Sequence, residues 1–384
     1  MLDKYKDLME DCSMCNDQCV YGCPVFTINR TTTVYPGRKV YLARCIIKNE
    51  IELDENVQDV LYQCCSCGLC KTFCLYGIKG KPRDPVPLIQ KIRHEIIKKG
   101  IKTDFVTEAE LRIKEFGNLY GDVSNILEEV KATNKSGKNG GILYLVDAEM
   151  LAISPEAPKA AIQLMNKKNI KPIISDMLET GYDIKAIGFF EEAVSIAKNT
   201  ADYLNNLSVS KLIVSSPKAF YALTEWYKEI NIKINKEVIL ETDFFRNLLI
   251  VHHNEYKLRP SDIQNFIKNE GLVVYHDGSF MARYLKNFDT PRMLIKPLFT
   301  RYEELRTSRE EARPLAPAVY PLGLSDDYLE KLANNRIVDI MELKPDYVIT
   351  SDSLSYAALK KYWDKDKVLS IPEALLMSFV DMEK

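Results

Sequence analysis

The cysteines constrain this chain more than any other feature. All ten of them lie between Cys12 and Cys74 of a 384-residue sequence. They form two groups, separated by a stretch that contains only Cys45. Thiolates are the ligands that zinc and iron–sulfur clusters need, so any sulfur chemistry belongs to the N-terminal part of the chain.

The spacing within the groups indicates cluster binding. The second group follows the C-x2-C-x2-C-x3-C spacing of bacterial-type clusters, through Cys64, Cys67, Cys70 and Cys74. The first group has one extra residue before its third cysteine, and runs through Cys12, Cys15, Cys19 and Cys23. Two-residue gaps let backbone turns wrap three thiolates around one corner of a cubane, while the fourth thiolate points away.

We therefore predict two [4Fe–4S] clusters. In two-cluster ferredoxins the fourth cysteine of each run binds the other cluster. This crossing assigns one cluster to Cys12, Cys15, Cys19 and Cys74. It assigns the other to Cys64, Cys67, Cys70 and Cys23. Cys65 competes with Cys64, and the sequence leaves that choice open.

Disulfides and zinc are the competing interpretations. Disulfides belong to oxidising compartments, but residues 1–7 lack the apolar core of a secretory signal, which predicts a cytoplasmic protein. Zinc also accepts four thiolates, but zinc ribbons pair two separated C-x2-C knuckles. A metal-stapled binding module remains the alternative.

Charge and hydrophobicity exclude two classes of partner. The net charge of −2 and the pI of about 6.2 give no reason to expect nucleic-acid binding. The longest apolar stretches, such as 141–146 and 211–214, are far shorter than the ~20 residues of a membrane span.

The pattern of apolar residues divides the chain. Residues 1–100 look helical, ending in a helix over 84–99, and residues 101–140 form a further helix and a polar linker. Strand and helix patterns then alternate, which indicates parallel sheets covered by helices. The expected strands are 142–146, 184–190 and 212–215, and the expected helices are 155–168, 191–206 and 217–226.

The second part of the chain repeats. Ile213–Leu223 aligns without a gap with Val348–Ala358, about 130 residues later. Ile142–Asp147 likewise resembles Val273–Gly278. We expect two α/β (βαβ) repeats, 141–258 and 259–384, so that the fold class is α+β multidomain.

The N-terminal part resembles a known module. The two cysteine groups, Pro24, Tyr35–Tyr41 and the helix to Ile97 are similar to the dicluster ferredoxin module of the heterodisulfide reductase superfamily. That superfamily includes glycolate-oxidase and glycerol-3-phosphate-dehydrogenase iron–sulfur subunits. The resemblance covers about residues 8–100, and Leu75 departs from it where a proline is usual.

The resemblance extends to the repeats, but their cysteines are missing. It implies a CCG domain in which Ser279 replaces the cysteine of the His-Asp-Pro-Cys stretch. Ser216–Ala219 and Ser351–Leu354 stand where Cys-Pro-x-Cys elements would follow a strand. Serine does not replace a redox sulfur, so we expect a degenerate CCG domain that keeps the fold without its sulfur centre.

We expect an iron–sulfur electron-transfer subunit that passes single electrons between redox partners, one of which could be a flavoprotein. The degenerate CCG domain would be its docking scaffold. Arg38, Lys39 and Arg44 could form a basic surface for an acidic partner, or a solvated helix face. The alternative is a redox enzyme with a non-cysteine active site, for which His276 and Asp277 are the weak catalytic candidates.

Overall fold

The computed structural model describes residues 3–74, 76, 82–134, 141–249 and 266–379. Most of the predicted linker, 135–140, lies outside these residues. The described chain has no helix long and apolar enough to cross a bilayer.

The N-terminal part is entirely helical in its regular structure. Pro24, Pro36 and Pro87 each stand in the first turn of a helix, where a missing N–H costs nothing. Its helices are η1 (Asp3–Tyr5), α1 (Lys6–Ser13), η2 (Gln18–Val20), α2 (Pro24–Asn29), η3 (Thr32–Val34), α3 (Pro36–Ile47), α4 (Glu55–Tyr62), α5 (Leu69–Thr72) and α7 (Val86–Lys98).

Two helices connect this part to the sheets. α8 (Asp104–Phe116) ends at Gly117, whose φ of +69° closes the helix in the left-handed conformation. α9 (Ser124–Ala132) then starts anew. The sequence predicted continuous helix across this break, because its apolar residues recur on both sides of Gly117.

The rest of the chain contains two parallel four-stranded sheets. The first has the order β2-β1-β3-β4, and the second has the order β6-β5-β7-β8. The strands of the first are β1 (Ile142–Leu145), β2 (Ile173–Ile174), β3 (Lys211–Val214) and β4 (Glu237–Leu240). Those of the second are β5 (Asn269–His276), β6 (Phe299–Glu303), β7 (Tyr347–Thr350) and β8 (Val368–Ser370).

Helices connect the strands, as the βαβ pattern predicted. In the first sheet unit they are α10 (Ala148–Ile153), α11 (Glu156–Lys167), α12 (Tyr182–Ala186), α13 (Phe190–Asn206), α14 (Pro217–Tyr221), the π-turn η4 (Ala222–Trp226), α15 (Tyr227–Glu229) and α16 (Glu241–Leu249). In the second they are the π-turn η6 (Phe280–Tyr284), α17 (Asp289–Ile295), η7 (Lys296–Leu298), η8 (Arg309–Glu311), α18 (Asp326–Leu343), α19 (Ser353–Tyr362) and α20 (Ile371–Ser378).

One predicted strand is wrong. The run 184–190 forms the end of α12 and the turn into α13, and the strand next to β1 is Ile173–Ile174. A short apolar run fits a buried strand and a buried helix equally well, since both bury every residue. Gly181, with φ of +85°, starts α12 in a conformation that favours glycine.

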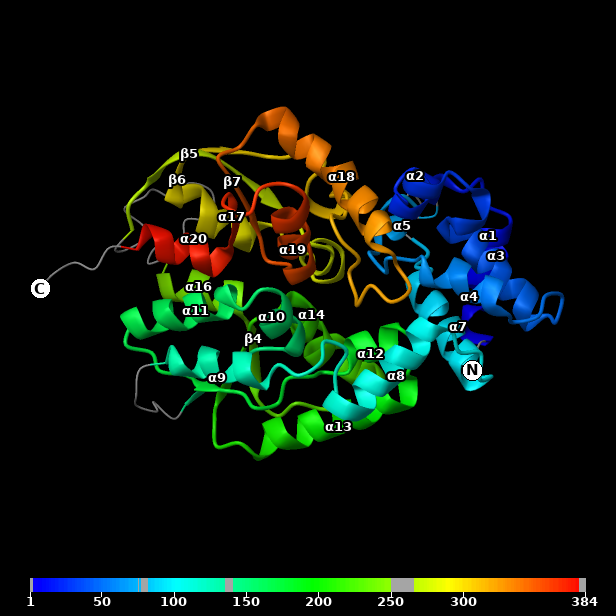
Figure 1. Ribbon diagram of the computed structural model, residues 1–384, viewed down its shortest axis with the longest axis horizontal. Helices are drawn as coiled ribbons and strands as arrows, with labels where there is room; N and C mark the ends of the chain where they lie inside the picture. The colour runs from blue at the N-terminus through cyan, green and yellow to red at the C-terminus, as the bar shows by residue number, and fades with distance from the viewer. Residues whose placement is uncertain (1–2, 75, 77–81, 135–140, 250–265, 380–384) are drawn as a thin grey trace, which may run out of the picture.

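The two sheet units share one core. Side chains from both units meet in a single buried cluster, for example Val146, Phe245, Val273 and Leu375. α11 packs against α20, and α16 packs against α17. Figure 1 shows the units lying one above the other, with the helical part at the ends of α18, α8 and α12.

Buried polar contacts attach the helical part to the first sheet unit. The guanidinium of Arg93 on α7 is 2% exposed. It donates to Ala186 O at 3.0 Å in the sheet unit and to Leu61 O at 2.9 Å and Cys64 O at 2.8 Å in the helical part. Tyr62 donates its hydroxyl to Ile187 O at 2.7 Å. The thiol region is thus fixed relative to the sheets.

Candidate iron–sulfur centre

The local structure aims backbone N–H groups at cysteine sulfur. Cys23 is the N-cap residue of α2, and the Phe26 amide at the N-terminus of the helix lowers the pKa of the Cys23 thiol. Cys67 stands before Gly68, whose φ of +74° starts α5, and the Leu69 amide faces the Cys67 sulfur. Burial raises the pKa of both thiols, and the free N–H groups at these helix N-termini, which stabilise negative charge, offset part of that rise.

Four of the predicted ligands form an outer thiol set. Its members are Cys12, Cys15, Cys19 and Cys74. Burial is the largest cause that raises the pKa of Cys12 to about 12, followed by its three neighbours Cys19, Cys74 and Cys15. The Arg83 amide donates to Cys74 Sγ at 3.2 Å. The structure therefore brings together the four cysteines of one predicted cluster, although Cys74 is far from the others in sequence.

The remaining predicted ligands form an inner thiol set. Cys23, Cys64, Cys67 and Cys70 line one cavity together with Cys65 and Lys39. This cavity contains about 360 Å³ of space, part of it open to solvent. Burial is the largest cause that raises the pKa of Cys23 to about 11. Cys23 thus lies with the second cysteine group, where the crossing rule places it.

Cys64 and Cys65 have different surroundings. The Cys64 thiol acts electrostatically on Cys23, Cys67 and Cys70. The Cys65 thiol is 2% exposed and contacts the hydroxyl of Tyr328. Cys65 also interacts with Cys67, Cys64 and Cys23, so both thiols lie within the inner set, and Cys64 is the one of the two that acts on Cys70. Cys45 is a separate buried thiol at 3% exposure.

The donor sets fit iron–sulfur clusters. In the described chain, no three side chains of His, Cys, Asp or Glu converge on a point that suits one metal ion. The inner thiols instead surround a cavity, as ligands of a larger group do. Buried thiolates without a cation are unstable, which is why burial raises the pKa of Cys12 and Cys23. Iron would supply the missing positive charge.

The charges around the two sets differ. Lys39 is 1% exposed, lines the inner cavity and donates from Nζ to Val34 O at 2.5 Å. It is not part of a basic surface, so that suggestion from the sequence is wrong for Lys39. Successive side chains of a helix are ~100° apart around its axis, so Lys39 points inward while the neighbouring Arg38 is exposed. Near the outer set, Asp11 and Asp17 raise the pKa of Cys12 and Cys19, although burial contributes more.

The second sheet unit covers the inner set. Arg283 Nε donates to Cys67 O at 2.5 Å, and the Tyr284 hydroxyl donates to Ser66 O at 2.6 Å. The Ala318 amide donates to Cys65 O at 2.9 Å. Three consecutive carbonyls of the thiol loop are therefore satisfied by residues more than 200 positions later.

The serines at the positions where the sequence resemblance implies cysteines make structural contacts. Ser279 Oγ accepts from Arg283 at 2.8 Å, and Ser216 Oγ donates to Asp147 at 2.5 Å. Ser351 Oγ and the Tyr275 hydroxyl form a hydrogen bond of 2.9 Å. These contacts hold loops at strand ends and leave no sulfur chemistry there.

The structure does not join His276 and Asp277 into an acid–base pair. Both carboxylate oxygens of Asp277 accept from Arg292, at 2.8 Å each. His276 is fully buried, and neither ring nitrogen has a hydrogen-bond partner among the described residues. Burial lowers the pKa of His276 well below its usual value, so the imidazole is neutral.

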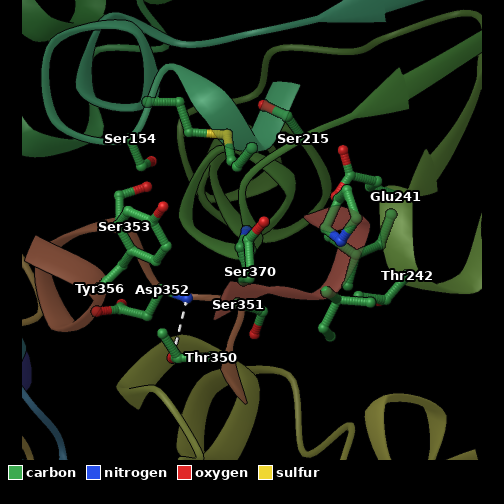
Figure 2. A pocket seen from close by; sticks show the side chains of 16 residues that line it. Ser154, Ser215, Glu241, Thr242, Thr350, Ser351, Asp352, Ser353, Tyr356 and Ser370 are labelled. Atoms are coloured by element: carbon green, nitrogen blue, oxygen red, sulfur yellow. Dashed lines mark hydrogen bonds between the residues drawn. The ribbon is translucent and has the colours of Figure 1, made fainter. Parts of the chain in front are cut away.

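A cavity opens at the carboxyl ends of β3, β4, β7 and β8, where ligands bind in many parallel sheets. It contains about 390 Å³ of space, part of it open to solvent. Figure 2 shows the hydroxyls on its wall. Those of Ser154, Ser215 and Thr242 have no hydrogen-bond partner among the described residues. The cavity was not predicted, since its walls come from two sheet units far apart in sequence.

Nothing in the sequence indicates the buried ionic network beside this cavity. Lys218 forms ion pairs with Glu149 and Asp183, and the Tyr120 hydroxyl donates to both carboxylates. Burial raises the pKa of Glu149 to about 8, and Lys218 opposes this rise. The members come from four separate segments, and no spacing rule brings them together.

Comparisons with known proteins agree with the geometry. Residues 11–79 match the 4Fe-4S dicluster domain family. The chain is also similar to a subunit of dihydromethanophenazine:CoB--CoM heterodisulfide reductase from two Methanosarcina species. It is 22% identical to that of M. barkeri over 77% of this chain and 71% of the relative, and 21% identical to that of M. acetivorans over 88% and 85%.

A crystal structure of a hypothetical protein from Helicobacter pylori shares the fold. Its TM-score is 0.55 at 12% identity, covering 100% of this chain and 76% of the other. Together with the dicluster match, the relatives support the assignment of this chain to the iron–sulfur heterodisulfide reductase-like superfamily.

Proposed function

We propose that this chain relays single electrons between redox partners through two [4Fe–4S] clusters, held by the outer and the inner thiol set. The observation that carries the proposal is the arrangement of the two sets, each with the four cysteines that the crossing rule assigns to it. When bound, each cluster would accept and release one electron. A flavoprotein is one candidate partner, and the cytoplasm is the proposed location.

The surrounding charges suggest a direction for the relay. A cation near a cluster site stabilises the extra negative charge of the reduced state. Lys39 and Arg283 are buried beside the inner set, where Asp84 also acts on Cys70. Asp11 and Asp17 lie beside the outer set, paired with Arg83 and Arg38 at positions more exposed than those of Lys39 and Arg283. Burial alone would make the more buried inner cluster harder to reduce than the outer one, since water stabilises the added negative charge. The proposal is that the buried cations outweigh it, and that electrons pass from the outer to the inner site.

The sheet units would serve as scaffold and docking surface. Their identical strand order and parallel strands support two copies of one βαβ unit, 141–258 and 259–384. Serines occupy the positions where the related domain has cysteines, and each forms structural hydrogen bonds. We propose a degenerate CCG domain that covers the inner thiol set through Arg283, Tyr284 and Ala318.

The test is a metal and redox analysis of anaerobically purified protein. We expect about eight iron and eight sulfide per chain, from two [4Fe–4S] clusters. Two electron paramagnetic resonance signals should appear at separate potentials in a dithionite titration. About two zinc per chain without bleaching would contradict the relay and leave a metal-stapled binding module.

A redox enzyme is the second candidate function. The cavity of Figure 2 favours it, because three buried hydroxyls on its wall lack partners among the described residues. The cavity has room for roughly one water molecule, at about 20 Å³, so an organic ligand would have to widen it to reach them. Purified protein should then contain flavin or another organic cofactor in stoichiometric amount, and its absence together with redox-active clusters would favour the relay.

A further inference from the structure

A larger cavity lies between the helical part and the first sheet unit. Its volume is about 240 Å³, slightly below the ~300–1,000 Å³ of drug-sized sites and therefore suited to a small ligand. α7 forms one wall, and α12, α13 and α15 with the preceding π-turn form the other. It shares no residue with the thiol cavity or with the cavity of Figure 2.

The cavity concentrates positive charge. Lys4, Lys91 and Lys185 line it, and Glu229 is its one lining carboxylate among the described residues. Lys91 is compensated by Glu95 at 3.2 Å. The net charge of the whole chain is −2, so this excess of lysine is a local feature.

Lys185 forms no ion pair within the described chain. Its ammonium group lies 4.8 Å from the ring centre of Tyr182 and 5.9 Å from that of Trp226. Burial lowers the pKa of Lys185 to about 8. Since that value is still above neutral pH, the side chain keeps its charge. Glu229 on the same wall opposes the fall in pKa, and an anion in the cavity would compensate the positive charge of Lys4 and Lys185 that Glu229 leaves over.

A second polar group on the wall is incompletely satisfied. Gln90 on α7 is 3% exposed and lines the cavity. Its amide lies near the Tyr182 hydroxyl, but Nε2 reaches no acceptor with hydrogen-bond geometry among the described residues. Gln90 Nε2 is itself buried beneath the surface of the wall, so Gln90 shapes the cavity and does not bind the ligand.

Aromatic rings form the rest of the wall. Trp226, Phe190 and Tyr5 line the cavity beside these polar groups. Trp226 is 1% exposed and held in the core by Tyr182 and Tyr227. Rigid rings provide a surface on which a planar ligand stacks.

We propose that this cavity binds a planar aromatic anion, a ring that carries a carboxylate or a phosphate group. Lys185 and Lys4 would bind the anionic group, and the partly exposed rings of Phe190 and Tyr5 would contact the ligand ring. The site is independent of the electron relay, because no cysteine lines it within the described residues.

Isothermal titration calorimetry on the full-length, cluster-loaded protein tests this site. Benzoate and AMP are the two anionic probes, and benzyl alcohol and adenosine are their neutral counterparts. At least one anion should bind one to one, tenfold or more tightly than its neutral counterpart. Benzoate alone would identify an aromatic carboxylate, and AMP alone an aromatic phosphate.

Variants locate the binding. Lys185→Met keeps the length of the side chain and should weaken binding tenfold or more. Lys228→Met is the matched control, because Lys228 is 70% exposed, pairs with Glu225 and does not line the cavity. It should change the affinity less than twofold. If Lys185→Met does not fold, Lys4→Met replaces it, with a threefold or greater loss expected, because Lys4 lines the same cavity.

Three results would overturn the proposal. One is no saturable binding of either anion up to about 10 mM, roughly −3 kcal/mol of binding free energy. Another is equal affinity for an anion and its neutral counterpart. The third is that Lys228→Met weakens binding as much as Lys185→Met does.

Discussion

At the scale of single residues, the surroundings of the inner thiols depend on which backbone N–H groups face each sulfur. Cys23 occupies an N-cap, a position usually held by Ser, Thr, Asp or Asn. Pro24 at the first helical position has no N–H, so the Phe26 amide is left to face the sulfur. Burial still raises the pKa of Cys23 to about 11, so the Phe26 amide offsets part of this rise and the thiolate forms only when a metal binds.

Cys64 and Cys65 should respond differently to replacement. We expect Cys64→Ala to lose about four iron per chain, since one cubane then lacks a ligand. Cys65→Ala should keep about eight iron per chain, because the Cys65 thiol contacts Tyr328. Iron and sulfide analysis of both variants is the measurement. Loss of iron in Cys65→Ala with full retention in Cys64→Ala would reverse the assignment.

Lys39 should set the potential of the inner site. Lys39→Met removes a buried charge and keeps most of the side-chain volume. A unit charge at ~7 Å and an effective dielectric constant of ~20 is worth roughly 2 kcal/mol. We therefore expect the inner potential to fall by on the order of 60–100 mV, since ~59 mV is a tenfold change for one electron.

A redox titration followed by electron paramagnetic resonance checks this shift. Lys48→Met is the control, since Lys48 lies at the C-terminal end of the same helix, away from the inner cavity. It should leave both potentials unchanged. If Lys39→Met leaves the inner potential where it is, the buried cation does not determine the direction of electron flow.

At the scale of elements, the close approach of α7 to the turn between α12 and α13 explains why position 188 is a glycine. Gly188, in the turn between α12 and α13, has φ of +115°. A Cβ atom there would lie 2.8 Å from Ile97 Cδ1 and 2.9 Å from Arg93 O on α7. Gly188→Ala should therefore destabilise the protein by ~2–4 kcal/mol, from backbone strain plus overpacking.

Gly100→Ala separates these two causes. Gly100 has φ of +78°, but a Cβ atom there would meet nothing within 4 Å. Gly100→Ala should lower the free energy of unfolding by only ~1–2 kcal/mol, the contribution of backbone strain. Chemical denaturation of both variants measures their free energies of unfolding. Equal losses of stability would mean that α7 shifts away from the added methyl group at no cost in free energy.

Much of the element pattern could be predicted from the sequence. Helices 155–168 and 191–206 and strands 142–146 and 212–215 are confirmed, because amphipathic spacing and β-branched runs are local signals. The strand at 184–190 is wrong because burial on all sides erases periodicity. Lys39 was misplaced because the direction of one side chain depends on the fold around it.

The start of α16 should make stability depend on pH. Glu241 is 3% exposed, its partner is the Tyr144 hydroxyl, and burial raises its pKa from 4.5 to about 8. Between these values the folded state holds one proton more than the unfolded state. Stability therefore falls as pH rises, by ~1.4 kcal/mol per pH unit for this group.

Glu241→Gln removes that titration. Relative to the original protein, the variant should gain stability steadily from about pH 5 to 8, at roughly 1.4 kcal/mol per unit. Denaturation at several pH values across this range measures the difference. A constant difference would show that Glu241 stays charged in the folded protein.

At the scale of the whole molecule, the contacts that matter most join distant segments. The cysteine sets follow from spacing, which the sequence displays. Arg283, Tyr284 and Lys218 carry no such signal, since their partners are chosen by the packing of three parts of the chain. The aromatic, lysine-rich cavity has the same origin and was equally invisible.

Removing the hydroxyl oxygen of Tyr284 should weaken the contact between the second sheet unit and the inner thiol set. Tyr284→Phe keeps the stack on Phe280, with ring centres 4.5 Å apart, and removes the hydroxyl that donates to Ser66 O. The buried carbonyl then lacks a partner, so we expect ~1–3 kcal/mol of destabilisation. Because Ser66 lies between Cys65 and Cys67, iron should leave the inner set faster under a chelator.

Chelator kinetics followed by electron paramagnetic resonance distinguish the two sites. The outer set should lose iron at its original rate, because no described contact joins Tyr284 to it. Tyr21→Phe is the matched control: Tyr21 lies in the loop of the outer set and is 82% exposed, so removal of its hydroxyl should change neither rate. Equal acceleration of both sites by Tyr284→Phe would instead indicate general unfolding, and the sheet units would not be a specific cover.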